Sequence, residues 1–186
     1  GGTMHGLQAW VALPVEHEED EPAFAHHEGE DLPTYDSGNG LWARLVVGEA
    51  FHARAKVKTH SPMFYVHWEL KAGAQGVMEA PYPERPAYGA RGAVEVDGAT
   101  LTEGRMAVFA PGDSPRFTAL TDATVMLLGG EPLGPRHVEW NFVSSRRERI
   151  EDAKADWRAG RFPMPPHDNA ERIPLPEPTP PANPMS

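Results

Sequence analysis

The sequence contains no cysteine among its 186 residues. This absence excludes a disulfide framework, a thiolate nucleophile and a thiolate metal site, and it fits a reducing compartment. No apolar run approaches the roughly 18 residues that a membrane-spanning helix needs. The first residues, GGTMHGLQAWVALP, lack the basic segment and long apolar run of a signal peptide. We therefore expect a soluble, cytoplasmic protein with no membrane partner.

Positive charge is missing from the first 43 residues, which hold nine acidic residues and neither Lys nor Arg. The rest of the chain holds the other 18 acidic residues and all 17 basic ones, so it is nearly neutral. An acidic stretch repels polyanions, which argues against nucleic acid as a direct partner. Its simplest interpretation is a solvated loop.

The sequence also lacks the common catalytic motifs. It has no G-x-S-x-G elbow, no P-loop and no G-x-G-x-x-G fingerprint. Ser144 and Ser145 are expected to cap a helix rather than to act as nucleophiles. We therefore find no reaction centre in the general motifs.

Short apolar runs, rich in β-formers, are separated by Gly, Pro and Asp along most of the chain. Turn signals at intervals of roughly 8 to 12 residues are typical of a sandwich or closed barrel. The pattern therefore predicts an all-β fold. The runs cover residues 7–13, 41–49, 63–70, 75–80, 92–98, 105–110, 115–120, 124–130 and 136–143.

Two of these runs allow sharper predictions. In MFYVHWEL (residues 63–70), Phe64, Val66, Trp68 and Leu70 share one face of the expected strand. In VEVDG, the pair Asp97-Gly98 is a strong hairpin signal. The run LQAWVAL (residues 7–13) is expected to be a buried strand.

One short helix is expected after the strands. Ser145 and Glu148 have the spacing of a capping box, and Gly160 stands where a C-terminal glycine belongs. Ile150, Ala153 and Trp157 share one face of this helix and should dock it. Residues 163–186 hold nine of the 20 prolines and should form an extended, mobile tail.

The order of these segments resembles the pirin family, whose members carry two cupin barrels in one chain. The resembling motifs are HGLQAWVALP (5–14), PAFAHH (22–27), SPMFYVHWEL (61–70), GGEPLGPRHVEWNFVSS (129–145) and RIEDAKADWRAGRF (149–162). The resemblance implies a cupin-type double-stranded β-helix, a jelly-roll barrel, with one C-terminal helix. It also implies that this chain is the C-terminal portion of such a bicupin, lacking the N-terminal metal-binding barrel. The expected parts are a remnant and acidic linker (1–60), the C-terminal cupin barrel (61–143), a docked helix (144–162) and the Pro-rich tail (163–186).

Cupin metal sites place two histidines and a glutamate in a first motif and a third histidine in a second. Laid on this sequence from Gly73 to Gly92, the first motif puts Glu79 and Pro81 at the histidine positions and Arg85 at the glutamate position. The second motif puts Pro115 at its histidine position and Ala119 at its asparagine position. One carboxylate without imidazoles is a poor site for a divalent metal. We therefore expect no metal cofactor in this chain.

The histidines have other interpretations. Adjacent His26 and His27 point to opposite faces of an extended chain and cannot chelate together. His17 stands between two glutamates in the acidic stretch, where adventitious metal binding is expected rather than function. His67 shares a strand face with Glu69 and is expected to be a hydrogen-bonded barrel residue. Glu79, Glu84 and Arg85 form a charged group that could bind a small polar ligand at the barrel mouth.

Three functional interpretations remain open. A metal-free barrel would act as a binding or scaffold module, whose protein partner or second copy covers Leu7, Trp10 and Val11 at the interface with the absent barrel. Alternatively, the chain is part of a quercetin 2,3-dioxygenase-like oxidoreductase, whose iron or other divalent metal lies in the N-terminal cupin, as the family resemblance implies. A third interpretation is an incomplete gene product without an independent role.

Overall fold

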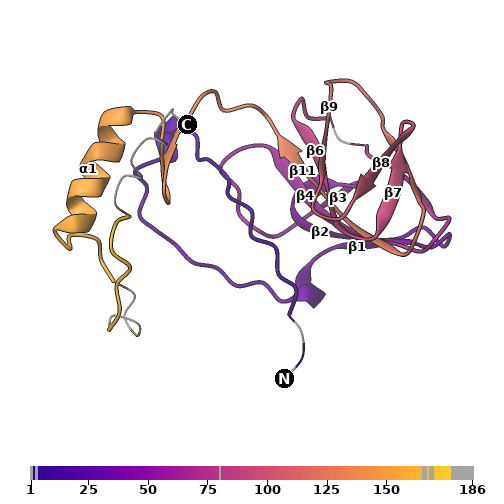
Figure 1. Ribbon diagram of the computed structural model, residues 1–186, viewed down its shortest axis with the longest axis horizontal. Coiled ribbons are helices and arrows are strands. Elements are labelled where there is room, and N and C mark those ends of the chain that lie inside the picture. The colour runs from indigo at the N-terminus through magenta and orange to yellow at the C-terminus, as the bar shows by residue number, and fades with distance from the viewer. Residues whose placement is uncertain (1, 3, 80, 165–166, 168–169, 177–186) are drawn as a thin grey trace, which may run out of the picture. The chain divides into compact units, whose positions relative to one another are not determined.

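The computed structural model describes Gly2, residues 4–79, 81–164, His167 and residues 170–176. The chain forms two compact units, Gly1–Glu18 with Gly134–Ser186, and Glu19–Leu133. We call them the small unit and the barrel unit (Figure 1). Within the described residues, no helix has the length and apolar character needed to cross a membrane.

The barrel unit consists of two antiparallel sheets that curl around one core (Figure 1). The larger sheet has seven strands in the order β1-β2-β4-β11-β6-β9, with β3 paired to β2. The smaller sheet has four strands in the order β5-β10-β7-β8. The strands of the larger sheet are β1 (Thr34–Asp36), β2 (Leu41–Ala50), β3 (Ala53–Arg54), β4 (Met63–Leu70), β6 (Arg85–Arg91), β9 (Met106–Phe109) and β11 (Ala123–Gly130). Those of the smaller sheet are β5 (Gln75–Val77), β7 (Ala93–Val96), β8 (Ala99–Thr102) and β10 (Arg116–Ala119), and a 3-10 turn, η2 (Gly29–Asp31), precedes β1.

The core lies between the two sheets and follows from the period-two pattern of the strands. Along β4, side chains alternate between half-buried and buried, and the four buried ones are those predicted from the sequence, Phe64 to Leu70. Trp68 from the larger sheet meets Phe117 from the smaller sheet edge to face, with ring centroids 5.5 Å apart. Each such buried side chain contributes about 1.5–3 kcal/mol to the stability of the fold. The apolar alternation therefore closes the barrel.

The predicted hairpin at Asp97-Gly98 is confirmed. Val96 pairs with Ala99, and the two turn residues have φ values of 48° and 83°. Both values lie in the left-handed region that a two-residue type I′ turn requires. Asp and Gly adopt this region at low cost, so this turn sets the register of β7 against β8.

The boundaries of the barrel differ from those predicted for residues 61–143. Strands β1 to β3 lie before residue 61, and the barrel unit ends at Leu133. Strand β1 is exposed at all three residues and has no apolar pattern, because an edge strand is held by backbone hydrogen bonds to one neighbour. The predicted strand at residues 7–13 is wrong, since these residues have no regular secondary structure and Trp10 is exposed.

The small unit packs a hairpin against the predicted helix. Strands β12 (His137–Glu139) and β13 (Phe142–Ser144) pair antiparallel, and α1 (Arg147–Arg158) follows them (Figure 1). A 3-10 turn, η1 (Val15–His17), precedes Glu18. Ile150 and Ala153 are buried on the helix, as predicted. They pack with the aromatic side chains of Trp140, Phe142, Trp157 and Phe162 into a second core.

Part of the predicted mobile tail is docked on this second core. The indole Nε1 of Trp157 donates to the carbonyl oxygen of Ile173 at 2.9 Å, and the Arg172 guanidinium lies over the Trp157 ring at 4.7 Å. Leu175 packs against the same aromatic group. Other parts of the predicted tail, residues 165–166, 168–169 and 177–186, lie outside the described residues.

The ends of α1 agree with only half of the sequence prediction. The C-terminal prediction is confirmed: Gly160 has φ 72°, and the N–H groups of Gly160 and Arg161 donate to the carbonyls of Trp157 and Asp156. The capping box is wrong, because the N-cap is Arg146 and no side chain caps the helix. The Ser145 hydroxyl donates to Glu18 instead.

Glu18 is the polar anchor of the small unit. Its carboxylate lies 2.9 Å from Arg136 Nε, with both side chains about one-tenth exposed. It accepts hydrogen bonds from the Ser144 hydroxyl at 3.0 Å and the Ser145 N–H at 2.9 Å. Burial by itself raises the pKa of Glu18, but the hydrogen bonds from Ser145 and Ser144 and the charge of Arg136 outweigh it and hold the pKa below its ordinary value. The anchor therefore depends on an ionised carboxylate.

We predict that Glu18→Gln destabilises the small unit by about 1.5–3 kcal/mol, the usual loss for hydrogen bonds to a charged group. Because the folded-state pKa is lowered, the contribution of Glu18 is present above the unfolded-state pKa and is lost as the pH falls through the folded-state value. Urea unfolding followed by tryptophan fluorescence at neutral and acidic pH measures both effects. Glu16→Gln, an exposed carboxylate in the same segment, is the matched control and should unfold like the wild type. Equal unfolding midpoints for Glu18→Gln and wild type at pH 7 would contradict the prediction.

Candidate functional site

The residues predicted to stand at the positions of cupin metal ligands differ in their exposure. Glu79 and Pro81 are exposed, whereas Arg85 is only 3% exposed. Pro115 and Ala119, at the second motif, are buried in the barrel. These five positions therefore offer a single carboxylate and no imidazole.

Arg85 is the first residue of β6 and holds a loop at the barrel mouth. Its two terminal guanidinium nitrogens donate to the backbone carbonyls of Ala110 and Asp113. The Asp113 carboxylate accepts from the Ala110 N–H at 3.0 Å and closes the same loop. Arg85 Nε is buried and has no hydrogen-bond partner among the described residues. Because a guanidinium keeps its charge, Arg85 places a fixed positive group beneath the mouth.

A pocket of about 950 Å³ opens beside Arg85. Of the residues predicted to bind a ligand, Glu79 and Arg85 line it. Glu84 is not among the described lining residues, and its backbone N–H and carbonyl pair with Gly130 at 3.3 and 3.1 Å. The structure thus brings two of the three predicted residues to one cavity. The described residues that line it come from three segments, 49–54, 78–85 and 111–114.

The lip of this pocket is a strained turn that the sequence analysis missed. Phe51 and His52 join β2 to β3 with φ values of 52° and 58°, although neither is Gly, Asn or Asp. Each such bulky residue costs about 1–3 kcal/mol, so the surrounding structure has to hold the turn. The Phe51 ring stacks on Tyr35 with centroids 5.6 Å apart and lies 6.5 Å from Trp68. His is enriched at positive φ, but Phe51 gives no signal of this conformation in the sequence.

Tyr82 also lines this pocket. Its ring stacks on Phe64 with centroids 5.6 Å apart, at an interplanar angle of 9°. Burial raises the pKa of Tyr82, and the nearby carboxylates of Glu49 and Glu131 raise it further. The phenol therefore stays protonated at neutral pH and keeps its hydrogen to donate.

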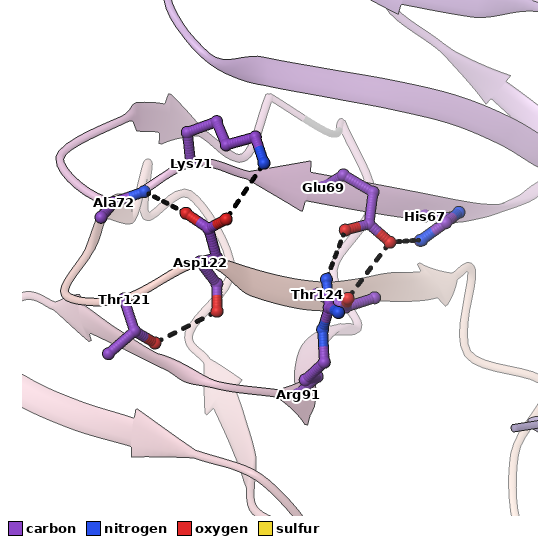
Figure 2. A network of polar contacts seen from close by, with 8 residues as sticks. All are labelled: His67, Glu69, Lys71, Ala72, Arg91, Thr121, Asp122 and Thr124. Atoms are coloured by element: carbon purple, nitrogen blue, oxygen red, sulfur yellow. Dashed lines mark hydrogen bonds and ion pairs between the residues drawn. The ribbon is translucent and has the colours of Figure 1, made fainter. Parts of the chain in front are cut away.

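A second polar group lies on the outer face of the larger sheet (Figure 2). There His67 Nε2 lies 2.9 Å from Glu69, and the same carboxylate contacts Arg91 at 3.1 Å and accepts from the Thr124 hydroxyl at 3.1 Å (Figure 2). The expectation that His67 is a hydrogen-bonded barrel residue is confirmed. Three neighbouring strands, β4, β6 and β11, supply these side chains, so the group ties the strands together.

Asp122 forms a second set of polar contacts, with Lys71 and Ala72. Its carboxylate accepts from Lys71 Nζ at 3.0 Å and from the Ala72 N–H at 2.9 Å (Figure 2). The Ala72 and Lys71 hydrogen bonds lower the pKa of Asp122. Of the eight residues drawn, the Glu69 carboxylate is bound by Arg91 and the Thr124 hydroxyl, the Asp122 carboxylate by Lys71 and the Ala72 N–H, and His67 is the one imidazole (Figure 2). The arrangement suits a structural role.

The small unit carries the residues predicted to meet another barrel. Leu7, Trp10 and Val11 are 43%, 58% and 56% exposed. An exposed indole with two aliphatic neighbours is an apolar surface of the kind that drives association.

Comparison with known proteins gives the family. The model of the pirin C-terminal cupin domain matches residues 65–163. A pirin-like protein of Caulobacter vibrioides is 61% identical over 178 residues, which are 95% of this chain and 62% of that protein. A putative quercetin 2,3-dioxygenase of Pseudomonas aeruginosa is 29% identical over 84% of this chain and 50% of its own length.

The fold comparison agrees with the sequence. A crystal structure of quercetin 2,3-dioxygenase from Acinetobacter baumannii superposes with a TM-score of 0.81 at 27% identity, covering 91% of this chain and 57% of that one. The chain thus spans about half to three-fifths of the length of the relatives it matches. The sheets of the barrel unit form a cupin β-sandwich, as the resemblance implied. The chain belongs to the pirin family, and its barrel is the family's C-terminal cupin domain.

Proposed function

We propose that this cupin domain is a binding and scaffold module without a metal of its own. The observation that carries the proposal is the replacement of the expected ligands by Pro81, Arg85 and Pro115, with Glu79 as the one remaining carboxylate. A divalent cation in a protein is held by several imidazole, carboxylate or carbonyl groups. The buried guanidinium of Arg85 would also repel a cation at this place. The residues at the predicted ligand positions therefore do not fit a metal.

The partner that fits best is a second cupin barrel that does hold a metal. More than a third of the Caulobacter relative lies outside the match, so the family context includes further chain of domain size. The exposed apolar surface of Leu7, Trp10 and Val11 supplies a contact for it. Tryptophan is among the residues that most often dominate binding energy at interfaces.

The second candidate is a part in a quercetin 2,3-dioxygenase-like oxidoreductase. The names of the Pseudomonas relative and of the Acinetobacter structure favour it. In that case the metal lies in another domain, and this chain stabilises or positions that domain. Purified alone, the chain should not turn over quercetin, and dioxygen-dependent loss of quercetin absorbance by the chain alone would contradict this assignment.

We predict that the purified chain retains much less than one metal ion per molecule after incubation with Fe²⁺, Ni²⁺ or Zn²⁺ and removal of the excess. Elemental analysis measures the ratio. His60 and Asp20, whose Nδ1 and Oδ2 atoms are 4.0 Å apart, lie outside the mouth pocket and could hold an adventitious ion. His60→Ala is therefore measured in parallel. If the wild type holds about one metal ion per molecule and His60→Ala holds none, the ion lies at His60 and not at the mouth. About one ion per molecule in both proteins would overturn the proposal.

We predict that the exposed apolar surface makes the isolated chain self-associate, because no partner covers it. Light scattering should give a mass above that of one 20.4 kDa chain, and Trp10→Asp should shift it to the monomer. Phe24→Asp, at an aromatic residue that is 92% exposed in the barrel unit, is the matched control and should still associate. A monomeric wild type that binds no apolar dye would contradict the expected surface.

A further inference from the structure

We infer that the pocket at the barrel mouth binds a neutral, multiply hydroxylated ring, such as a monosaccharide or a cyclic polyol. This goes beyond the proposed docking role, which concerns the small unit. The pocket, at about 950 Å³, lies near the upper end of the usual range for small-molecule sites, roughly 300–1,000 Å³. Such sites combine apolar and aromatic walls with a few polar groups that fix the orientation of the ligand.

The apolar walls come from side chains that the fold holds in place. Phe51 is fixed by its stacking on Tyr35, and Tyr82 by its stacking on Phe64. Met78, which is 1% exposed, also lines the pocket. Aromatic and thioether surfaces suit the C–H face of a saturated ring.

The described lining offers acceptors, which are the carboxylates of Glu49, Glu79 and Asp113, beside donors on side chains such as Arg85, Tyr82 and Ser114. Glu79 is exposed at the mouth, and one carboxylate oxygen of Asp113 accepts a hydrogen bond from the Ala110 N–H. An ionised carboxylate only accepts hydrogen bonds, so a ligand has to bring donors. Hydroxyl groups are donors that also accept, and they can therefore pair with the protonated Tyr82 phenol as well. A ring with several hydroxyls matches this set better than an aliphatic or an aromatic hydrocarbon.

The charges of the lining favour a neutral molecule. Glu49 and Arg54 neutralise each other in an ion pair at 3.2 Å. Glu79 and Asp113 then stand against the guanidinium of Arg85, and the remaining excess of negative charge disfavours an anion. A cation is disfavoured at the inner side of the pocket, next to the buried Arg85. A neutral ligand avoids both penalties and still receives charge-assisted hydrogen bonds from its hydroxyls to the carboxylates.

The site is also held before any ligand arrives. Arg85 fixes the loop at residues 110–114 through two carbonyls, and the strained Phe51-His52 turn is kept by the ring packing of Phe51. A rigid wall lowers the entropy lost on binding. Strain of this kind gathers at ligand sites, which is a second reason to place a ligand here.

The test uses the full chain and a panel of named probes: glucose, galactose, mannose, xylose, ribose and myo-inositol, with glucuronate and glucosamine as charged versions of one ring. Amide and indole NMR shifts are followed up to about 50 mM, where a site with a Kd of roughly 10 mM is mostly filled. We expect at least one neutral probe to shift signals from residues 49–54 and 78–85. For glucose and its two charged versions, we expect the neutral ring to bind several-fold more tightly than either.

Variants separate a real site from general surface effects. Glu79→Ala should weaken binding about tenfold, or roughly 1.4 kcal/mol. Glu84→Ala, an exposed neighbour outside the pocket lining, is the control and should bind like the wild type. Arg85→Ala would also remove the hydrogen bonds that hold residues 110–114, so its effect on binding would be ambiguous. Glu79→Ala is therefore the variant that decides the test.

Four results would overturn the inference: no shift with any neutral probe, equal binding by wild type and Glu79→Ala, tighter binding of glucuronate than of glucose, or tighter binding of glucosamine than of glucose. Tighter binding of glucuronate would identify an anion site at Arg85, and tighter binding of glucosamine would identify a cation site at the carboxylates. None of these results affects the metal ratio or the mass in solution, on which the proposed docking module depends. The two proposals can therefore fail separately.

Discussion

The edge-to-face contact of Trp68 with Phe117 joins the two sheets of the barrel, and the other features of this unit follow from it. Both rings are fully buried, and Gly76 lies so close to Trp68 that a side chain there would collide with the indole. The contact therefore fixes the distance between the sheets. The Trp68 ring also lies 6.5 Å from the Phe51 ring, measured between centroids, and so contributes to the position of the lip of the mouth pocket. Packing in the core thus determines the shape of the candidate site.

Arg85 holds a loop at the barrel mouth without the help of a metal ion. A metal would gather imidazoles from both sheets and hold them by coordination. Here the guanidinium gathers the carbonyls of Ala110 and Asp113 and holds the loop by hydrogen bonds. Both solutions place positive charge at the mouth and order a loop there, but only the metal leaves an open coordination position for chemistry.

The sequence predicts turns and buried strand faces, because neighbouring residues determine them. It does not predict features that depend on contacts between distant residues. The pair Asp97-Gly98 predicts a turn because these residues adopt left-handed conformations easily. The alternation of apolar and polar residues along β4 predicts its buried face. Phe51 adopts a left-handed conformation with no such signal, and its ring stacks on Tyr35, a contact between residues 16 positions apart. Arg85 and Glu79 could be placed at the mouth from the cupin motif, but the wall formed by Tyr82 depends on long-range packing against Phe64. Ser145 has the spacing of a capping box, yet its hydroxyl donates to the carboxylate of Glu18, 127 positions away.

In the small unit, the proposed docking surface and the polar anchor belong to one continuous segment. Arg136 pairs with Glu18 and also donates to the carbonyl of Leu13 at 2.8 Å, so one side chain holds two points of that segment. The exposed Trp10 and Val11 precede these points by only a few residues. A partner that covers Trp10 therefore binds a segment whose end is already fixed, which lowers the entropy cost of docking. Loss of the Glu18 charge would release that end. Stability of the small unit and affinity for a partner should consequently change together, through the same ion pair.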